Sequence, residues 1–599
     1  MTDSDKGRLP WFQLTSWSLL GATSSKTSTI VIIVSIRVAF VRCCSSHPLS
    51  KASFKTLTDA VAHSAFHNSE EQFDAPKCHE NTRVAVLRKI MDWITGQDPE
   101  TRDRYIMWLT GAAGAGKSAI AHKIVELCIQ SGALVASFFF NRSDGTRNNV
   151  KRLISTLAYQ LASSIPAVRA AILREIEEDP LIFKKGLDYQ FDALVAKSLD
   201  SEGISKLNGP RVIIIDGLNE CIDRDQQVQI LNMVRKATEQ VQPPIHFLIA
   251  SRPEHEIKAV FNSQSMKNIL ARLVLDDTYR PNQDIERFLC DNFNEIKADH
   301  PFKDCIPRPW PTDEDVHKVV QKSSGQFIYA ATVIRYVKSL RHMPHQRLST
   351  AIGLTPVKGD LPFAELDCLY RTILSLVENI QEVFMIFALC VTSSREPALD
   401  ILFASTIDLV FSLGAGELQL LLCDLGSLVS LSYTGIEFLH ASLLDFLFDP
   451  ARSKEYFIDV AIYNPRIFCK IMDAIYSHSR TKLFVLSQSL HDLIVLFGAY
   501  SEDVCLSDDV INGIDGFPFE DVLRSIWEKA DHHLLPKTGV EIFILSFLRI
   551  LKKIVRGFYW VLYHLYKTSS CIFSPRKMHI FYTLNRNIGK LWMPFIYLS

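Results

Sequence analysis

The sequence lacks several features that would assign it to a common class. It has 599 residues and thirteen cysteines, but no C-x-x-C pair and no partner pair for Cys78-His79, so the spacing excludes a Cys/His zinc site. No uncharged apolar run reaches the roughly 18 residues that a membrane-spanning helix requires. No internal repeat of about 20–50 residues is visible, which excludes a solenoid or propeller.

Net charge is also nearly absent. Lys and Arg total 65 while Asp and Glu total 66, a formal net charge of −1, so bulk charge does not favour a polyanion as partner. The odd, scattered set of cysteines indicates reduced thiols in a cytoplasmic protein. Charged residues make up 22% and hydrophobic residues 47% of the chain, which excludes a wholly disordered or fibrous protein.

The first third of the chain changes character twice. Residues 1–60 are rich in Ser and Thr and are interpreted as a poorly structured leader; within them, the apolar stretch 29–41 contains Arg37 and favours a buried element over an anchor. Residues 61–104 are predicted to be a helical linker leading into the core. Residues 105–280 alternate short apolar strands with helices, which predicts an α/β fold with a parallel sheet flanked by helices.

The later segments are predicted from the same patterns. Residues 281–360 are expected to form a helical domain, 361–460 a mostly helical module with a short β piece near 425–438, and 461–599 a helical C-terminal region. The strands of the sheet are expected at 105–110, 134–140, 211–216, 246–251 and 271–275.

The strongest signal is a glycine-rich loop between the first predicted strand and the next helix. Residues 111–118, GAAGAGKS, fit G-x-x-x-x-G-K-[ST]. Small residues let backbone N–H groups approach phosphate oxygens, and the helix N-terminus favours the same anion. We expect Lys117 to reach the β- and γ-phosphates and Ser118 to hold Mg²⁺. The other residues expected to surround the phosphates are Gly111, Gly114, Ala115, Gly116 and Ala119.

Further candidates follow two other predicted strands. Asp216 comes after four apolar residues, as a metal-side carboxylate should. Glu220 is the candidate to orient or deprotonate an attacking water, and a solvated loop carboxylate is the alternative. Arg252 is either a sensor of the γ-phosphate or a plain surface arginine. No N-K-x-D motif for guanine follows the acidic strand, which favours an adenine nucleotide, ATP or ADP.

Several segments together resemble a known group. MWLTGAAGAGKSAIA, VIIIDGLNEC, HFLIASRPE and SSGQFIYAATVIRYV occur in the order and spacing of fungal NACHT-type P-loop proteins with a nephrocystin-like N-terminal nucleotide-binding module, which belong to the STAND class of signal-transducing ATPases. CHENTRVAVLRKIMDWI and FLHASLLDFLFDPARS extend the resemblance over roughly residues 60–460. The resemblance implies a NACHT core at 105–280, a winged-helix-like region within 361–460 and a signalling role similar to innate immunity.

The resemblance also implies a mechanism and the residues that serve it. ADP would hold a closed monomer, and ATP would favour an open, self-associating state. Lys117 and Ser118 would contact phosphate and magnesium, Asp216 would be the metal-side acid and Arg252 the sensor. His440, in LHAS, would meet the β-phosphate of ADP; a buried core histidine is the alternative. No motif identifies the triggering ligand or the effector.

One residue departs from the pattern of the group. Asn219 stands where the usual D-G-L-D-E-C has an aspartate, and an amide cannot act as a base. We therefore predict nucleotide binding with slow hydrolysis. The alternatives are a catalytically inert nucleotide-binding scaffold, which Asn219 favours, and a P-loop kinase or ATPase acting on a small molecule, for which no acceptor pocket or lid signature is visible.

The end of the chain is strongly basic. Residues 536–599 hold ten basic residues and a single acid, Glu541. Within 541–567 the five basic residues fall on one narrow stripe of a predicted amphipathic helix: Arg549, Lys552, Lys553, Arg556 and Lys567. This helix could make peripheral contact with an anionic membrane surface. The alternative, slightly favoured, is that its apolar face packs against the body. Nucleic acid is not an expected partner, because no reader motif accompanies the charge.

Overall fold

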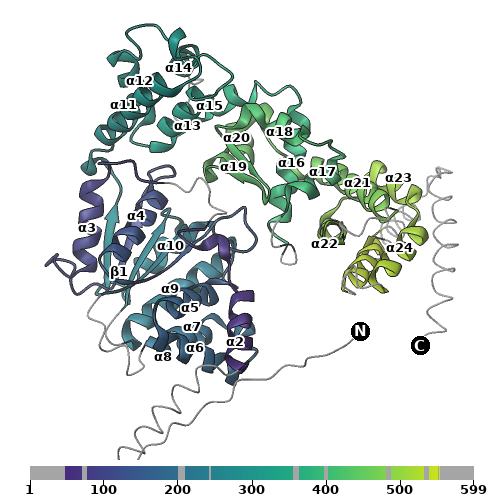
Figure 1. The fold of residues 1–599 in the computed structure, drawn as a ribbon, viewed down its shortest axis with the longest axis horizontal. Coiled ribbons are helices and arrows are strands. Elements are labelled where there is room, and N and C mark those ends of the chain that lie inside the picture. The colour runs from purple at the N-terminus through teal and green to yellow at the C-terminus, as the bar shows by residue number, and fades with distance from the viewer. Residues whose placement is uncertain are drawn as a thin grey trace, which may run out of the picture.

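The structure is a computed structural model (Figure 1). Both the apolar stretch 29–41 and residues 554–567 of the predicted basic helix lie outside the described residues. The described residues are 48–69, 77–199, 210–241, 245–354, 363–396, 399, 402–480, 487–531, 538–550 and 552–553.

The core of the nucleotide-binding region is a five-stranded sheet in the order β2-β3-β4-β1-β5. All four neighbouring pairs are parallel, which confirms the predicted α/β fold. Continuous apolar runs form the inner strands, where both faces of the sheet are covered, whereas the edge strand β5 alternates buried and exposed residues. The strands are β1 (Ile106–Thr110), β2 (Leu134–Phe139), β3 (Arg211–Asp216), β4 (His246–Ser251) and β5 (Leu270–Val274).

Alternate strand residues enter two separate hydrophobic clusters. Trp108 packs in the cluster that includes residues of α5 (Leu153–Ser164), α6 (Pro166–Glu178), α9 (Arg224–Gln240) and α10 (His255–Phe261). Its neighbours Met107 and Leu109 pack in the cluster with α3 (Val84–Ile94) and α4 (Lys117–Gln130). This alternation follows from the two-residue period of a strand, and it fixes α4, which follows the glycine-rich loop, against one face of the sheet.

The prediction of a poorly structured leader is wrong for residues 48–59. They form α2 (Pro48–Asp59), which packs against α5 and α6. The Phe54 ring lies 4.2 Å below the Arg169 guanidinium and 6.0 Å from the Tyr159 ring. The chain after α2 is held as well, because Thr156 Oγ1 accepts a hydrogen bond from the Ala62 N–H at 3.0 Å. Composition alone missed α2 because its few apolar residues are separated by Ser, Thr and Lys.

Helices dominate the rest of the chain, as predicted. The region after the sheet consists of α11 (Pro281–Asp299), α12 (Asp313–Ser323), α13 (Phe327–Val337) and α14 (Pro344–Gly353). The next part contains α15 (Ala364–Leu374), α16 (Ile380–Ser393), α17 (Ala404–Phe411) and α18 (Glu417–Leu422). A short antiparallel hairpin of β6 (Val429–Ser432) and β7 (Gly435–Phe438) follows and leads into α19 (Ala441–Leu447) and α20 (Pro450–Ser453).

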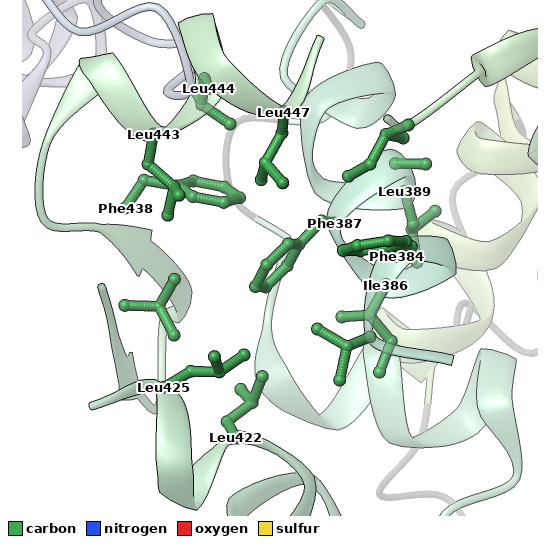
Figure 2. Packing of buried hydrophobic residues seen from close by; sticks show 14 of the residues in the cluster. Phe384, Ile386, Phe387, Leu389, Leu422, Leu425, Phe438, Leu443, Leu444 and Leu447 are labelled. Atoms are coloured by element: carbon green, nitrogen blue, oxygen red, sulfur yellow. The ribbon is translucent and has the colours of Figure 1, made fainter. Parts of the chain in front are cut away.

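The hairpin and α19 are fixed by a shared apolar core. Phe387 of α16 packs edge-on against Phe438 of β7, with ring centroids 5.1 Å apart. Leu443 and Leu447 of α19 point toward these rings (Figure 2). The turn between β7 and α19 is therefore held in place by residues on both of its sides.

The C-terminal helices continue the same hydrophobic cluster. They are α21 (Val460–Ser479), α22 (Ser487–Asp503), α23 (Asp508–Gly516), α24 (Phe519–Asp531) and a helix over 538–550. In this last helix Val540, Phe543, Phe547 and Ile550 are buried, and Arg549 pairs with Glu502 at 2.8 Å. The described part of 541–567 therefore packs against the body. No helix among the described residues combines the length and the apolar character needed to cross a bilayer.

Candidate functional site

The glycine-rich loop joins β1 to α4 and touches the helical region. Gly114 and Gly116 have φ angles of +75° and +90°, a conformation that glycine adopts without the clash that a side chain would cause. A Cβ on Gly114 would lie 2.1 Å from Ile328 Cγ2 at the start of α13. Glycine is therefore required at position 114 for two reasons: it permits the turn, and it lets α13 approach the loop.

Lys117 begins α4 and turns back over the loop. Its Nζ donates hydrogen bonds to the carbonyl oxygens of Gly111 and Ala112, both at 2.9 Å. Burial, together with the nearby Arg252, lowers the pKa of Lys117 to about 8, while Asp216 and Glu220 oppose this shift. The ammonium group is thus mostly charged at neutral pH and suits an anion in the same space.

Asp216 and Ser118 form a pair of oxygen ligands suited to a divalent cation. Asp216 ends β3 with 4% of its surface exposed, and it accepts a hydrogen bond from the Ser118 hydroxyl. Burial raises the pKa of Asp216 to about 7. A hard cation such as Mg²⁺ takes oxygen ligands of this kind and would hold the carboxylate ionised. The two residues therefore fit the predicted metal role.

The short 3₁₀ turn Leu218–Glu220 follows β3 and carries two polar residues. Burial raises the pKa of Glu220, against the opposing effect of Arg252 and Arg142, and Glu220 Oε2 accepts a hydrogen bond from the Arg142 N–H at 3.4 Å. Asn219 is buried, and its Oδ1 accepts the Arg252 N–H at 2.9 Å. Glu220 is thus partly buried and hydrogen-bonded to the backbone of Arg142, and the amide oxygen of Asn219 positions the backbone of Arg252.

Arg252 follows β4, which lies between β1 and β3 in the sheet. Its Nη1 lies 2.5 Å from Asp445 Oδ2 of α19, and its side chain is 22% exposed. Arg142 approaches the other oxygen of the same carboxylate, with 3.7 Å between Nη1 and Oδ1. Arg252 is therefore not a plain surface arginine, because it joins the sheet domain to the module that contains α19.

His440 is the N-cap of α19. Its Nδ1 accepts the N–H of Ser442 at 3.0 Å, and Ser442 Oγ lies 2.7 Å from the same nitrogen. Burial lowers the pKa of His440 to about 3, with Arg252 and Lys117 adding to the effect. The ring is therefore neutral at physiological pH, and with Nδ1 as acceptor its proton sits on Nε2.

A cavity of about 650 Å³ brings most of the predicted residues together. Gly111 and Ala115 are not among the described residues that line it; the Gly111 carbonyl accepts from Lys117, and the Ala115 carbonyl accepts from Arg83. The helical regions contribute Ile328 and Arg335 of α13 and Leu439 before α19. The predicted residues that line the cavity are Gly114, Gly116, Lys117, Ser118, Ala119, Asp216, Glu220, Arg252 and His440.

Sequence reasoning missed Arg83, which buttresses the loop. Arg83 is 5% exposed and its Nη2 donates to Ala115 O at 2.8 Å. Its backbone N–H donates to Asp284 Oδ2 of α11 at 2.9 Å, and its guanidinium carbon lies 4.9 Å from the centre of the Phe327 ring. Arg83 lies in the segment CHENTRVAVLRKIMDWI, but its partners are far away in the sequence and no local pattern points to them.

Comparison with known proteins gives a family match for part of the chain. Residues 85–252 match the family model described as "Nephrocystin 3, N-terminal", well under half of the chain. They contain the glycine-rich loop, Asp216, Glu220 and Arg252. No curated protein matches the sequence. The sheet order, the loop between β1 and α4 and this match define a P-loop fold of the nucleotide-binding class.

Solved structures resemble the chain only distantly. A STAND protein with a tetratricopeptide repeat sensor from Pyrococcus horikoshii has 11% identity and a TM-score of 0.38, covering 80% of this chain and 59% of that one. A RuvB mutant from Thermotoga maritima has 12% identity and a TM-score of 0.27, covering 62% and 98%. Drosophila ORC bound to DNA has 12% identity and a TM-score of 0.24, covering 88% and 79%. The chain thus spans 59% of the length of the first, and similarities this weak carry no argument about function.

Proposed function

We propose that the protein is a STAND-type switch of the NACHT subclass that binds ATP or ADP with Mg²⁺. It hydrolyses ATP slowly and signals through a change of domain arrangement and self-association. One observation carries this proposal: a single cavity is lined by the glycine-rich loop, by α13 and by the turn before α19. A nucleotide bound there would touch all three parts, so its phosphates can bias how they are arranged.

The roles of the residues follow from their chemistry. Lys117 and the backbone N–H groups of the loop would bind the phosphates, and Mg²⁺ held by Ser118 and Asp216 would neutralise their charge. The Nε2–H of neutral His440 is a donor suited to a phosphate oxygen of ADP. Arg252 would meet the third phosphate, which only ATP has.

Slow hydrolysis is proposed because Asn219 stands where the pattern of the group has an aspartate, which leaves Glu220 as the proposed base. Glu220 lines the cavity, and its raised pKa suits a group that accepts a proton from water. Asn219 cannot take this role, because an amide is not a base; its oxygen accepts the N–H of Arg252. Phosphate release at an ordinary ATPase rate would contradict the proposal of slow hydrolysis.

Size-exclusion chromatography with light scattering tests the proposal. With ADP and Mg²⁺ we expect a compact monomer, and with a non-hydrolysable ATP analogue a larger or self-associated species. A Lys117→Ala variant should not respond to either nucleotide. If the wild-type protein binds both nucleotides without any change in size, the switch is wrong, and an inert scaffold or a small-molecule kinase becomes the better interpretation.

We further propose a cytoplasmic location, with residues 541–567 as the one candidate for peripheral membrane contact. The described part of this segment is packed through Phe543, Phe547 and Ile550, which favours an internal role. Pelleting with anionic liposomes, with and without the segment, tests the contact: equal pelleting would exclude it.

A further inference from the structure

The candidate sensor arginine already has an anionic partner inside the protein. Asp445 of α19 faces Arg252 at 2.5 Å and Arg142 at 3.7 Å, one guanidinium for each carboxylate oxygen. Arg252 and Asp445 are each 22% exposed, so the surrounding protein partly shields the pair from water and salt. These contacts join the sheet domain to a helix that lies almost 200 residues further along the chain.

The packing of α19 fixes the direction of Asp445. Leu443, Leu444, Phe446 and Leu447 are all buried, and Leu443 and Leu447 point into the apolar core around Phe387 (Figure 2). Asp445 is the polar position among them. Because the core and the His440 cap hold α19 in place, the backbone of Asp445 moves away from the arginines only when the module moves.

Arg252 also faces the phosphate site. It lines the cavity together with Lys117 and Glu220, and its charge lowers the pKa of Lys117 and opposes the rise in that of Glu220. A guanidinium in this position can bind either the carboxylate of Asp445 or a terminal phosphate. The carboxylate and the phosphate are both oxyanions, and both accept hydrogen bonds from the same guanidinium N–H groups.

We propose that Asp445 is an internal competitor of the γ-phosphate for Arg252 and Arg142. This inference rests on the proposed nucleotide switch and names the contact that makes it respond to the third phosphate. ADP has no group that reaches Arg252, so Asp445 keeps both arginines and α19 stays against the sheet domain. The γ-phosphate of ATP carries more negative charge than one carboxylate and takes the arginines.

The exchange explains why the domains would separate. Once the arginines bind phosphate, Asp445 is a partly buried carboxylate without a cation, close to another anion. An unpaired charge in such a place is unfavourable. Moving α19 into solvent relieves it, and the same movement takes His440 out of the cavity.

The test compares the affinities of two nucleotides in two variants. Asp445→Asn keeps the shape of the side chain but loses the charge that holds the arginines. We expect its affinity for a non-hydrolysable ATP analogue to rise at least about fivefold relative to its affinity for ADP, the lower end of usual coupling between sites. In chromatography with ADP, the variant should resemble the wild-type protein with the ATP analogue.

Two controls separate competition from simple damage. Asp449→Asn makes the same charge change in the same module, but the Asp449 carboxylate caps α20 through the N–H groups of Ala451 and Arg452, so the ratio of the two affinities should not change. Asp445→Glu should retain the wild-type ratio. If Asp445→Asn lowers both affinities equally, so that their ratio stays at the wild-type value, the result contradicts competition.

Failure of the inference and of the proposed function can be told apart. If the wild-type protein binds neither nucleotide, the proposed switch is wrong, and the competition falls with it. If the wild-type protein binds both and opens with the ATP analogue, but Asp445→Asn keeps the wild-type ratio, the switch stands and the role of Asp445 is overturned.

Discussion

The cavity has two walls, and they are built in different ways. The first wall consists of short segments that follow the carboxyl ends of β1, β3 and β4, so neighbouring strands of one sheet bring its residues together. The second wall consists of residues along α13 and in the turn before α19. Its residues are placed by the packing of helices far along the chain.

The difference separates two tasks. The first wall holds the charged groups that suit phosphate and Mg²⁺, and a rigid parallel sheet fixes their geometry. The second wall approaches the first through a few contacts, chiefly Ile328 on Gly114 and Asp445 on Arg252. Binding chemistry therefore belongs to the sheet, whereas sensitivity to domain position belongs to contacts that can be broken one at a time.

Gly114→Ala is expected to have the largest effect, because it disrupts the contact between Gly114 of the first wall and Ile328 of the second. The new Cβ would lie 2.1 Å from Ile328 Cγ2 in a backbone with φ +75°, so we expect a loss of roughly 2–5 kcal/mol in the free energy of unfolding. Gly116→Ala is the matched control, because φ is +90° but nothing lies within 4 Å, and roughly 1–2 kcal/mol is expected. Denaturant unfolding without nucleotide measures both. Equal losses would mean that α13 does not press on the loop.

Lys117→Ala should weaken phosphate binding by the first wall and leave the second wall unchanged. Removing the ammonium group takes away charge-assisted hydrogen bonds to phosphate, and we expect nucleotide affinity to fall by about 100-fold. Lys123→Ala is the control on the same helix, since Lys123 is an outer residue paired with Glu126 at 2.8 Å. Titration with a fluorescent nucleotide reports both. A comparable loss in the control would point to damage of α4 instead.

The pH dependence of binding sharpens the description of the first wall. The pKa of Asp216 is raised to about 7, so Mg²⁺ must displace a proton at lower pH, and affinity for Mg²⁺-nucleotide should fall about fivefold between pH 7 and 6. The pKa of Lys117 is lowered to about 8, so affinity should fall again above that pH. Calorimetric titration from pH 5.5 to 9 should show a maximum between these values. Asp216→Asn should lose the acidic limb.

The smallest change is expected at the residue that departs from the family pattern. Asn219→Asp supplies the carboxylate that the pattern of the group has at this position and keeps an oxygen for the Arg252 N–H, so ATP hydrolysis should rise by about threefold. Glu220→Gln, one residue on, should change hydrolysis far more and in the opposite direction, because it removes the proposed base. Release of labelled phosphate measures both. An unchanged rate in the Asn219→Asp variant would show that the missing aspartate does not limit turnover.

The first wall was predictable from the sequence because its signals are local. The loop from Gly111 to Ser118 carries its own chemistry in consecutive residues, and Asp216 ends an apolar run that could only be a buried strand. The strands themselves followed from the short apolar segments, and each strand end in the structure lies within one residue of the predicted bound, inside the usual uncertainty of element ends.

The second wall could be predicted only in part. His440 was found through resemblance, but nothing in the pattern around Asp445 indicates that it meets Arg252, since the contact depends on the orientation of α19. The same holds for α2, whose partners α5 and α6 lie about a hundred residues away. Such contacts depend on how the helices pack. The sequence predicts which face of a helix is apolar, but it does not predict which other face that helix packs against.

The bond between Arg83 and Ala115 determines how small an autonomous nucleotide-binding fragment can be. A fragment starting at Val84 would retain the glycine-rich loop and all five strands, yet the Ala115 carbonyl would lose its guanidinium donor. Since Asp284 fixes the backbone of Arg83 from α11, truncation before that helix would loosen the same support from the other side. The minimal unit therefore extends beyond the strands at both ends.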